Sequence, residues 1–264
     1  MASESLTGHT VAITGGAGGL GKAIATAFLS KGANVAICDV NQDRLTQCET
    51  EWSSNYPGKF LASKTDITDE SGVESFITAI VTKFDRLDMV VNNAGIIDNF
   101  DPVGTTSKET WDRVMGINLT GMFLISKAAV NAMEAQSPPG GTIINIGSVA
   151  SYRGVNGGFA YTVSKHGVVG ITKNIAGYYM DKGINSIALL LGGMDDTNLS
   201  DNFLAGINQD GMMRIGSANP GYTPGKTNVQ LADVAKYCVF LADRDIAASS
   251  NGGVITFNKN WPVA

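Results

Sequence analysis

Short apolar runs alternate with longer helical patterns along the whole chain. Five runs are apolar without strict alternation, which is typical of strands buried on both faces of a sheet. They are Val11–Ile13, Val35–Cys38, Met89–Val91, Ile143–Ile146 and Ile187–Leu190, with weaker candidates at Phe60–Ala62 and Val254–Phe257. Between them, apolar residues recur at helical spacing, as in Leu20–Phe28 and Val73–Phe84. This alternation predicts an α/β fold of three layers, in which a doubly wound parallel sheet of about seven strands has helices on both faces.

One long segment shows no clear periodicity. It runs from about Gly192 to Val229 and is rich in Gly, Asn, Pro and Asp. A loop of this length inside a compact domain is more often a cover for a substrate than a simple connection. We therefore expect residues 192–230 to form a substrate loop or lid within a single domain that spans residues 1–264.

Length, charge and cysteine content narrow the class of protein. The 264 residues suit one larger α/β domain, and the formal net charge of −5 repels nucleic acid and anionic membrane surfaces, so neither is an expected partner. Three cysteines without metal-ligand spacing favour reduced thiols and no metal site. Together with an N-terminus that lacks a secretory pattern, this predicts a cytoplasmic protein. A charged fraction of 16%, against about 25% on average, hints that other subunits cover part of the surface.

A glycine-rich turn follows the first predicted strand and leads into a helical pattern. Its sequence is Thr14-Gly15-Gly16-Ala17-Gly18-Gly19-Leu20-Gly21. Glycines let the backbone turn sharply and approach a pyrophosphate, and the helix N-terminus attracts the phosphate charge. A glycine-rich turn alone also occurs as a tight connection. The strand before it and the amphipathic helix after it favour a dinucleotide site.

An aspartate ends the second predicted strand. Asp39 lies about twenty residues beyond the glycines, where a carboxylate accepts hydrogen bonds from the adenosine ribose hydroxyls and repels a 2′-phosphate. The glycine turn contains no Arg or Lys, and the nearest cation, Lys22, lies inside the following helix. The pattern favours NAD over NADP, and an aspartate that merely caps the strand end is the alternative.

A tyrosine and a lysine share one face of a later helical pattern. Tyr161 and Lys165 are four residues apart, so the ammonium can lower the pKa of the phenol from about 10 toward working pH. By itself this spacing is common on solvated helix faces. Upstream, the predicted strand Ile143–Ile146 leads into Ser148, whose hydroxyl is then at the carboxyl end of a strand, where open α/β sheets bind their ligands.

Taken together, these motifs resemble the short-chain dehydrogenase/reductase family in its single-domain form. The family's glycine motif matches at Thr14, Gly15, Gly19 and Gly21, and its Asn-Asn-Ala-Gly motif matches at Asn92, Asn93, Ala94 and Gly95. The family's catalytic tetrad matches Ser148, Tyr161, Lys165 and Asn118. The matches run in the family's order from position 14 to position 165.

The resemblance implies which parts of the chain do what. Residues 1–100 would mainly bind the dinucleotide, residues 101–191 would carry the tetrad, and residues 192–230 would cover the substrate. The implied cofactor contacts are Gly15, Gly19, Leu20, Gly21, Asp39, Asp66, Ile67, Asn93, Ala94, Gly95, Tyr161, Lys165, Gly192 and Thr197, with Asp66 near the adenine ring. The chain departs from the family's pattern at Leu191-Gly192, at Thr197, which comes one residue late, and at Asn258-Lys259-Asn260.

The resemblance also implies a mechanism and an assembly. Tyr161 would exchange a proton with the substrate oxygen, Lys165 would lower the pKa of Tyr161 and bind the nicotinamide ribose, and Ser148 would hydrogen-bond the substrate. Asn118 would hold a water molecule that links Lys165 to solvent. In the family the tyrosine helix often pairs with its copy in another subunit, which implies a homodimer or homotetramer. The small residues Ser164, Gly167 and Gly170 on this helix would permit close approach.

The expected substrate is a small, mostly apolar secondary alcohol of terpenoid, steroid or polyketide size. The segments expected around the substrate carry few charges, and their apolar candidates are Ile96, Phe100, Val149, Tyr152, Val155, Phe159, Met194, Leu199, Phe203, Met212 and Met213. Since cellular NAD is largely oxidised, alcohol oxidation is the expected direction. Two alternatives stay open, an NAD(P)H-dependent carbonyl reductase of a biosynthetic pathway and a non-redox protein that uses the cofactor structurally.

Overall fold

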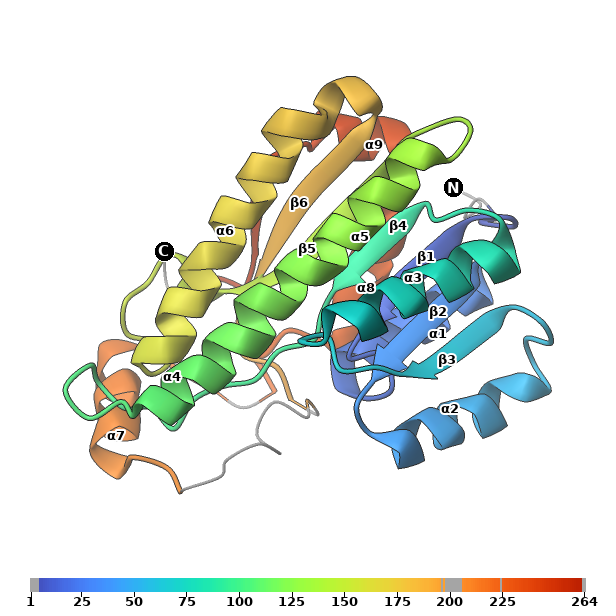
Figure 1. Ribbon diagram of the computed structural model, residues 1–264. Coiled ribbons are helices and arrows are strands. Elements are labelled where there is room, and N and C mark those ends of the chain that lie inside the picture. Colours follow the sequence, from blue (N-terminus) through green and yellow to red (C-terminus); the bar gives the residue numbers. More distant parts are fainter. Residues whose placement is uncertain (1–4, 196, 198–205, 224, 263–264) are drawn as a thin grey trace.

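Seven parallel strands form one sheet through the middle of the molecule (Figure 1). The computed structural model describes residues 5–195, 197, 206–223 and 225–262. The strands are β1 (Thr10–Thr14), β2 (Asn34–Asp39), β3 (Phe60–Lys64), β4 (Met89–Asn92), β5 (Gly141–Ser148), β6 (Ile184–Leu191) and β7 (Val254–Phe257). Their order is β3-β2-β1-β4-β5-β6-β7, and every neighbouring pair is parallel. All seven predicted strands are present, which confirms the doubly wound Rossmann arrangement.

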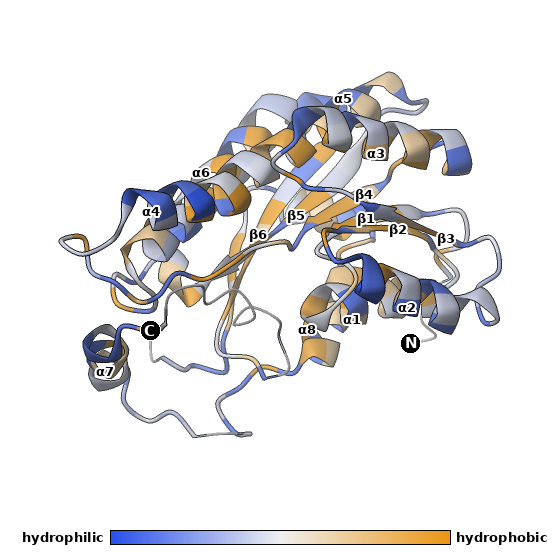
Figure 2. Ribbon diagram, turned by 60° about the horizontal axis from the view of Figure 1, so that its bottom comes forward, coloured by the Kyte–Doolittle hydropathy of each residue, from blue (hydrophilic) through white to orange (hydrophobic). Residues whose placement is uncertain are grey.

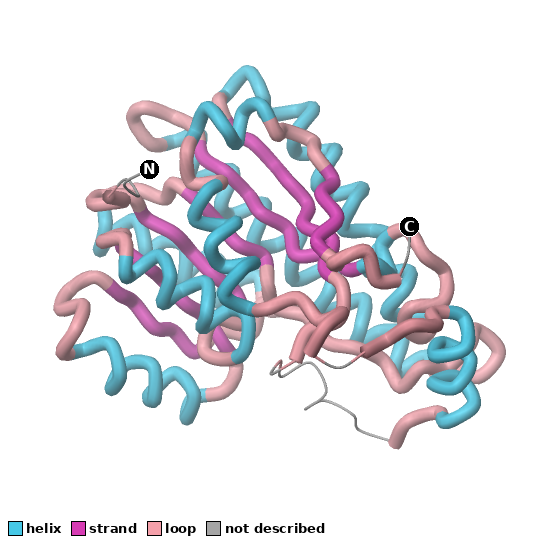
Figure 3. Tube along the Cα trace, turned by 180° about the vertical axis from the view of Figure 1, so that it is seen from behind, coloured by secondary structure: helices cyan, strands magenta, loops and turns pink. Residues whose placement is uncertain are grey.

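Helices cover both faces of the sheet, and Figure 3 shows the same layering from behind. One face carries α1 (Gly19–Ser30), α2 (Gln42–Ser53), α8 (Leu231–Phe240) and α9 (Arg244–Ser249), and the other carries α3 (Glu70–Phe84), α5 (Met122–Ala135) and α6 (Phe159–Tyr179). Each face has its own apolar cluster, built around side chains such as Phe28 on the first face and Phe76 on the second. Figure 2 shows the apolar strands enclosed between these two layers.

One continuous helical run extends over residues 108–135. It begins as α4 (Lys108–Met115), passes through a π-helical turn (Gly116–Gly121) and continues as α5. Length and apolar composition alone would allow this run to cross a membrane, but half of its apolar window is buried inside the protein. Because α5 packs against the sheet through side chains such as Ile125 and Met133, covering the sheet accounts for its apolar character.

Helix α7 (Gln209–Ala218) corrects the expectation that the segment from Gly192 to Val229 lacks periodic structure. None of its residues is buried, so its sequence has no need of the apolar stripe of a helix that packs on a core. Asn208 begins the helix, and its side-chain oxygen accepts the N–H of Gly211 at 2.9 Å. The helix lies apart from the sheet, beyond the carboxyl ends of the strands (Figure 1).

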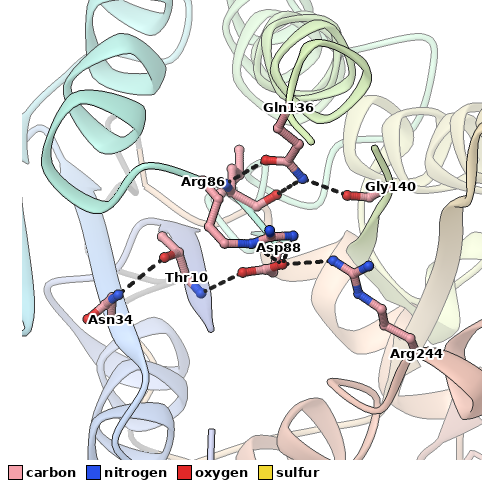
Figure 4. A network of polar contacts seen from close by, with 8 residues as sticks. Thr10, Asn34, Arg86, Asp88, Gln136, Gly140 and Arg244 are labelled. Carbon is pink, nitrogen blue, oxygen red and sulfur yellow. Dashed lines mark hydrogen bonds and ion pairs between the residues drawn. The ribbon is translucent and has the colours of Figure 1, made fainter. Parts of the chain in front are cut away.

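At the end of the sheet opposite the glycine-rich turn, a buried carboxylate joins the amino ends of the central strands β1 and β4. Asp88 accepts the N–H of Thr10 at 3.0 Å and pairs with Arg86 at 2.7 Å and Arg244 at 2.9 Å (Figure 4). Burial alone would raise the pKa of Asp88, but the hydrogen bonds from Arg86 and Thr10 outweigh it and hold that pKa below its usual value. This network joins the amino ends of the two central strands, far from the glycine turn at the carboxyl end of β1.

Asp88→Asn should lower the free energy of unfolding by about 2 kcal/mol at pH 7, because a set of charge-assisted hydrogen bonds is lost from a buried site. The pKa of Asp88 is lowered on folding, so its contribution is present above the ordinary aspartate pKa and is lost as pH falls below about 4. Urea unfolding at pH 7 and at pH 3 measures both effects. Equal stability of variant and wild type at pH 7 would refute this role.

Candidate active site

The glycine-rich turn between β1 and α1 is packed as a phosphate cradle must be. Gly15 has a φ of +60°, and a side chain at Gly21 would overlap the carbonyl oxygen of Gly15. Gly18 stands at the N-cap of α1 and brings no capping side chain to the first N–H groups of the helix. A helix N-terminus of this kind suits a pyrophosphate. The turn therefore fits the dinucleotide expected from the sequence.

Asn93 clasps this turn to the end of β4. Its side-chain nitrogen donates to the carbonyl oxygens of Thr14 at 3.0 Å and Gly15 at 3.2 Å. In return, the Thr14 hydroxyl oxygen accepts the backbone N–H groups of Asn93 and Ala94, each at 3.0 Å. The clasp spans the point where the strand order reverses, which is where open α/β sheets bind dinucleotides.

Asp39 lies half-buried at the end of β2, directly beside the glycine turn. One carboxylate oxygen accepts the N–H of Ala17 at 3.3 Å, and the other accepts the N–H of Asn41 at 3.0 Å. Lys22, the cation nearest the turn in sequence, pairs with Glu51 at 2.7 Å. The edge of the turn therefore presents a carboxylate, while this lysine is engaged with α2.

Asp66 and Ile67 follow β3, at the same carboxyl ends of the strands as the glycine turn. Asp66 is exposed and accepts both the N–H and the hydroxyl of Thr68, at 2.9 Å and 2.7 Å. Ile67 is buried against Gly121 of the π-helical turn, where a side chain on the glycine would overlap it. This contact joins the β3 loop to the helix that carries Asn118.

Strand β5 and helix α6 bring Ser148, Tyr161 and Lys165 together. Ser148 ends β5, and its side chain is near enough to the Tyr161 hydroxyl to lower the pKa of the phenol. The Lys165 Nζ atom lies 5.6 Å from the centre of the Tyr161 ring and donates to the carbonyl oxygen of Ile146 at 3.0 Å. Both Tyr161 and Lys165 are buried, at 5% exposed each, so the phenol and the ammonium meet in a largely water-free setting.

Asn118 reaches the same place from the π-helical turn, a feature that is frequent at functional sites. Its side chain accepts the N–H of Ile96 and donates to the Ile96 carbonyl oxygen, both at 2.9 Å, and donates to the Ser164 hydroxyl at 3.0 Å. A methyl group at Gly95 would lie 3.2 Å from Asn118 Oδ1 and 3.6 Å from Lys165 Nζ. All four residues of the expected tetrad therefore gather around one point.

Burial dominates the titration of this cluster. It raises the pKa of Tyr161 to about 12, against an opposing effect of the Ser148 side chain and with a further rise from the charge of Asp98. It lowers the pKa of Lys165 to about 8. The lowering of the Tyr161 pKa by Lys165 that the sequence predicts is not found in the protein alone, where burial has the largest influence on both groups.

The expected substrate-facing residues are only partly brought together. Ile96 and Val149 are buried near the tetrad, whereas Tyr152, Val155, Met212 and Met213 are exposed. Phe159 stacks on Trp111 at 5.5 Å between ring centres, so it packs α4 on α6. Leu199 and Phe203 lie outside the described residues. Met194 pairs with Val229 in a β-bridge, and Thr197 is half-buried in the loop after β6.

The C-terminal departure from the family's pattern keeps a left-handed turn. Lys259 and Asn260 have φ angles of +50° and +56°, which glycine adopts more readily. The side-chain oxygen of Asn258 accepts the N–H of Asn260 at 2.9 Å and so supports the turn. This segment packs against Gly192, whose N–H donates to Phe257 at 3.1 Å.

The small residues on α6 serve mainly the same subunit. Ser164 is fully buried and donates to the carbonyl oxygen of Tyr161 at 2.8 Å. The space beside Gly167 is filled by Leu119. The expectation that these two residues face another copy is therefore wrong, because they pack α6 on the π-helical turn. Gly170 has open space beside it among the described residues.

The chain belongs to the short-chain dehydrogenase/reductase family. The family model described as short chain dehydrogenase matches residues 9–207. The short chain dehydrogenase/reductase dpfgG of Gibberella zeae is 43% identical over 97% of this chain and 95% of that protein. The 3beta-hydroxysteroid dehydrogenase 2 of Eggerthella lenta is 34% identical, with the same coverage. The crystal structure of levodione reductase superposes with a TM-score of 0.83 at 29% identity, over 97% of this chain and 98% of that one.

Membership defines the class of reaction. The protein is an oxidoreductase that acts on alcohols or ketones, with a fold that binds a nicotinamide dinucleotide and takes a small molecule as substrate.

Sequence analysis did not identify one residue that contacts the helix of Tyr161. Asp98 lies buried beneath the start of α6, and the only sign of it in the sequence is a charge within an apolar segment that follows Gly95.

Proposed function

We propose that the protein oxidises a mostly apolar secondary alcohol to a ketone, with NAD as cofactor. The observation that carries this proposal is the convergence of Ser148, Tyr161 and Lys165 beside the glycine turn. A bound NAD would supply the acceptor for the hydride that leaves the carbinol carbon. Tyr161 takes the hydroxyl proton, Ser148 hydrogen-bonds the substrate oxygen, and Lys165 stabilises the phenolate and binds the ribose. Asn118 holds a water molecule that connects Lys165 to solvent.

The same residues support a second direction of reaction. A Tyr161 pKa of about 12 keeps the phenol protonated, which suits donation of a proton to a ketone during reduction. A named reductase, levodione reductase, is among the similar structures. The second candidate is therefore an NAD(P)H-dependent carbonyl reductase that uses the same tetrad. Assays in both directions with one alcohol and ketone pair, compared at equal pH, decide between the two.

The choice of NAD rests on Asp39. Its carboxylate already lies against the turn, where it would bind the ribose hydroxyls and repel a 2′-phosphate. Lys22 is paired with Glu51, so it is not positioned to offset that repulsion. The remaining implied contacts, from Gly15 to Thr197, would surround the cofactor as the family pattern implies.

Asp39→Ala should lower the ratio of kcat/KM with NAD to kcat/KM with NADP by about tenfold or more, since ribose hydrogen bonds are lost and the repulsion of a phosphate is removed. Steady-state rates with each cofactor measure the ratio. Asp43→Ala is the matched control, because it removes the same charge from an exposed position in the first turn of α2. An unchanged ratio in Asp39→Ala rules out the assignment of NAD to this carboxylate.

The proposed function also includes the size of the substrate, a homo-oligomeric assembly and a cellular location. The apolar residues around the tetrad and the steroid dehydrogenase among the relatives support an alcohol of terpenoid, steroid or polyketide size. Residues 1–100 serve the cofactor, residues 101–191 carry the tetrad and residues 192–230 face the substrate within one domain. A homodimer or homotetramer would cover the groove between α5 and α6, where Phe123 is half exposed. The fold and composition support a cytoplasmic location.

A further inference from the structure

A carboxylate from a distant segment caps the helix that carries Tyr161. Asp98 follows β4 and is only 1% exposed. One of its oxygens accepts the N–H of Gly158 at 2.8 Å, and the other accepts the N–H of Tyr161 at 2.8 Å. Gly158 is the N-cap of α6 and offers no side chain for this purpose. Asp98 therefore does for α6 what a serine or aspartate at the N-cap does for other helices.

The glycine at position 158 is explained by this contact. Gly158 has a φ of −73° and a ψ of −177°, an extended conformation open to any residue. A side chain there would overlap the Asp98 carboxylate. A residue with its own capping side chain at position 158 would therefore leave no room for the Asp98 carboxylate, which caps the helix instead.

The segment that carries Asp98 continues through residues 99–101, which connect α6 to α7 and are called the bracket below. The carbonyl oxygen of Asp101 accepts the N–H of Phe159 at 2.8 Å, and the Asp101 carboxylate accepts the side-chain amide of Asn208 at 2.7 Å. The Asn208 N–H donates in turn to the carbonyl oxygen of Asn99 at 2.9 Å. The bracket thus ties the first turn of the tyrosine helix to the residue that begins α7.

Backbone geometry marks the bracket as a constrained piece of structure. Phe100 has a φ of +66°, which is rare for a bulky residue because its side chain crowds the backbone in this conformation. Its N–H donates to the Asp98 carboxylate at 3.2 Å, and its carbonyl group packs against Gly211 of α7. The surrounding contacts hold this strained residue in place, as is common beside active sites.

We propose that Asp98 is a positioning residue, which fixes the Tyr161 hydroxyl against Ser148 by capping α6 from the loop after β4. The inference rests on the proposed function, in which Tyr161 exchanges the proton. A carboxylate in this place is electrostatically unfavourable, because burial raises its own pKa and its charge adds to the rise in the pKa of Tyr161. What it supplies is a fixed orientation for the first turn of the helix.

Asp98→Ala should lower kcat about ten- to a hundredfold, since misplacing a reacting group by about 1 Å has effects of this size. The affinity for NADH, measured by fluorescence titration, should change less than about twofold, because the glycine turn and Asp39 are untouched. Asp98→Asn keeps the shape but turns an amide N–H toward a backbone N–H, and it should also lower kcat. This second variant serves if Asp98→Ala does not fold.

Rescue separates a positioning role from a loss of stability. The double variant Asp98→Ala with Gly158→Ser places a capping hydroxyl in the vacated space and should recover at least about fivefold in kcat. Gly158→Ser alone should be damaging, because the new side chain meets the Asp98 carboxylate. Asp243→Ala is the matched control. It removes the cap of α9, where Asp243 accepts two N–H groups, and should lower the melting temperature while leaving kcat unchanged.

Three results would overturn the inference. They are an unchanged kcat in both Asp98 variants, a parallel loss of kcat and NADH affinity, and a double variant that regains thermal stability without regaining kcat. Tyr161→Phe keeps this outcome distinct from failure of the proposed function. If Tyr161→Phe retains turnover, the function is wrong; if it loses turnover while Asp98→Ala does not, only the positioning role is wrong.

Discussion

Tyr161→Phe lowers kcat by about a thousandfold or more and leaves the affinity for NAD within about twofold of the wild type. The variant keeps the ring, its burial and its packing, and removes only the hydroxyl that lies beside Ser148. Without that hydroxyl, no residue of the proposed tetrad is placed to exchange a proton with the substrate oxygen. Steady-state rates and calorimetric titration with NAD measure the two quantities.

Tyr178→Phe provides the matched control for this variant. Tyr178 is on the same helix, is 78% exposed and lies more than four turns from Tyr161 along α6. Its replacement should change neither kcat nor affinity for NAD. If Tyr161→Phe turned over at the wild-type rate, Tyr161 would have no catalytic role. The result would then favour the alternative of a non-redox protein that uses the cofactor structurally.

Lys165→Met should abolish most of the turnover, by about a hundredfold or more, and stabilise the cofactor-free protein by about 1 kcal/mol. Burial lowers the pKa of Lys165 to about 8, which means that the charged ammonium is disfavoured inside the fold. A buried methionine fills a similar volume without that cost, while it removes the charge that stabilises the phenolate. Activity and stability are therefore expected to change in opposite directions.

The stabilisation expected from Lys165→Met depends on pH. A lysine whose pKa falls on folding destabilises the protein fully below its folded pKa, and the penalty fades as pH rises toward the ordinary value. The gain in melting temperature should thus be larger at pH 6 than at pH 10. Lys173→Met, at an exposed position of the same helix, should show no such trend. A loss of stability at pH 6 would mean that the Lys165 hydrogen bond to Ile146 outweighs burial.

The sequence predicts the sheet well because most of its strands are apolar on both faces. The two weaker candidates, β3 and β7, are the two edges of the sheet, and their residues are half-buried or exposed. Less apolar contact at an edge leaves a weaker signal. Helix α7 has no buried residue at all, which is why no periodicity reveals it.

The candidate site is predicted as a set of residues but not as an electrostatic environment. Motif spacing indicates Tyr161 and Lys165, whereas the direction of their pKa shifts depends on how deeply the fold buries them. Asp98 depends on tertiary structure in the same way. It caps a helix about sixty residues further along the chain, and no local pattern encodes a contact between such distant residues.

Oxidation of an alcohol by NAD is measured as the absorbance of reduced nicotinamide while the purified protein is incubated with cyclic secondary alcohols of terpenoid and steroid size. NAD and NADP are compared. We expect reduction of NAD with at least one alcohol, a much weaker signal with NADP, and no signal from Tyr161→Phe. Silence across the panel, with NAD binding confirmed by calorimetry, would contradict this expectation.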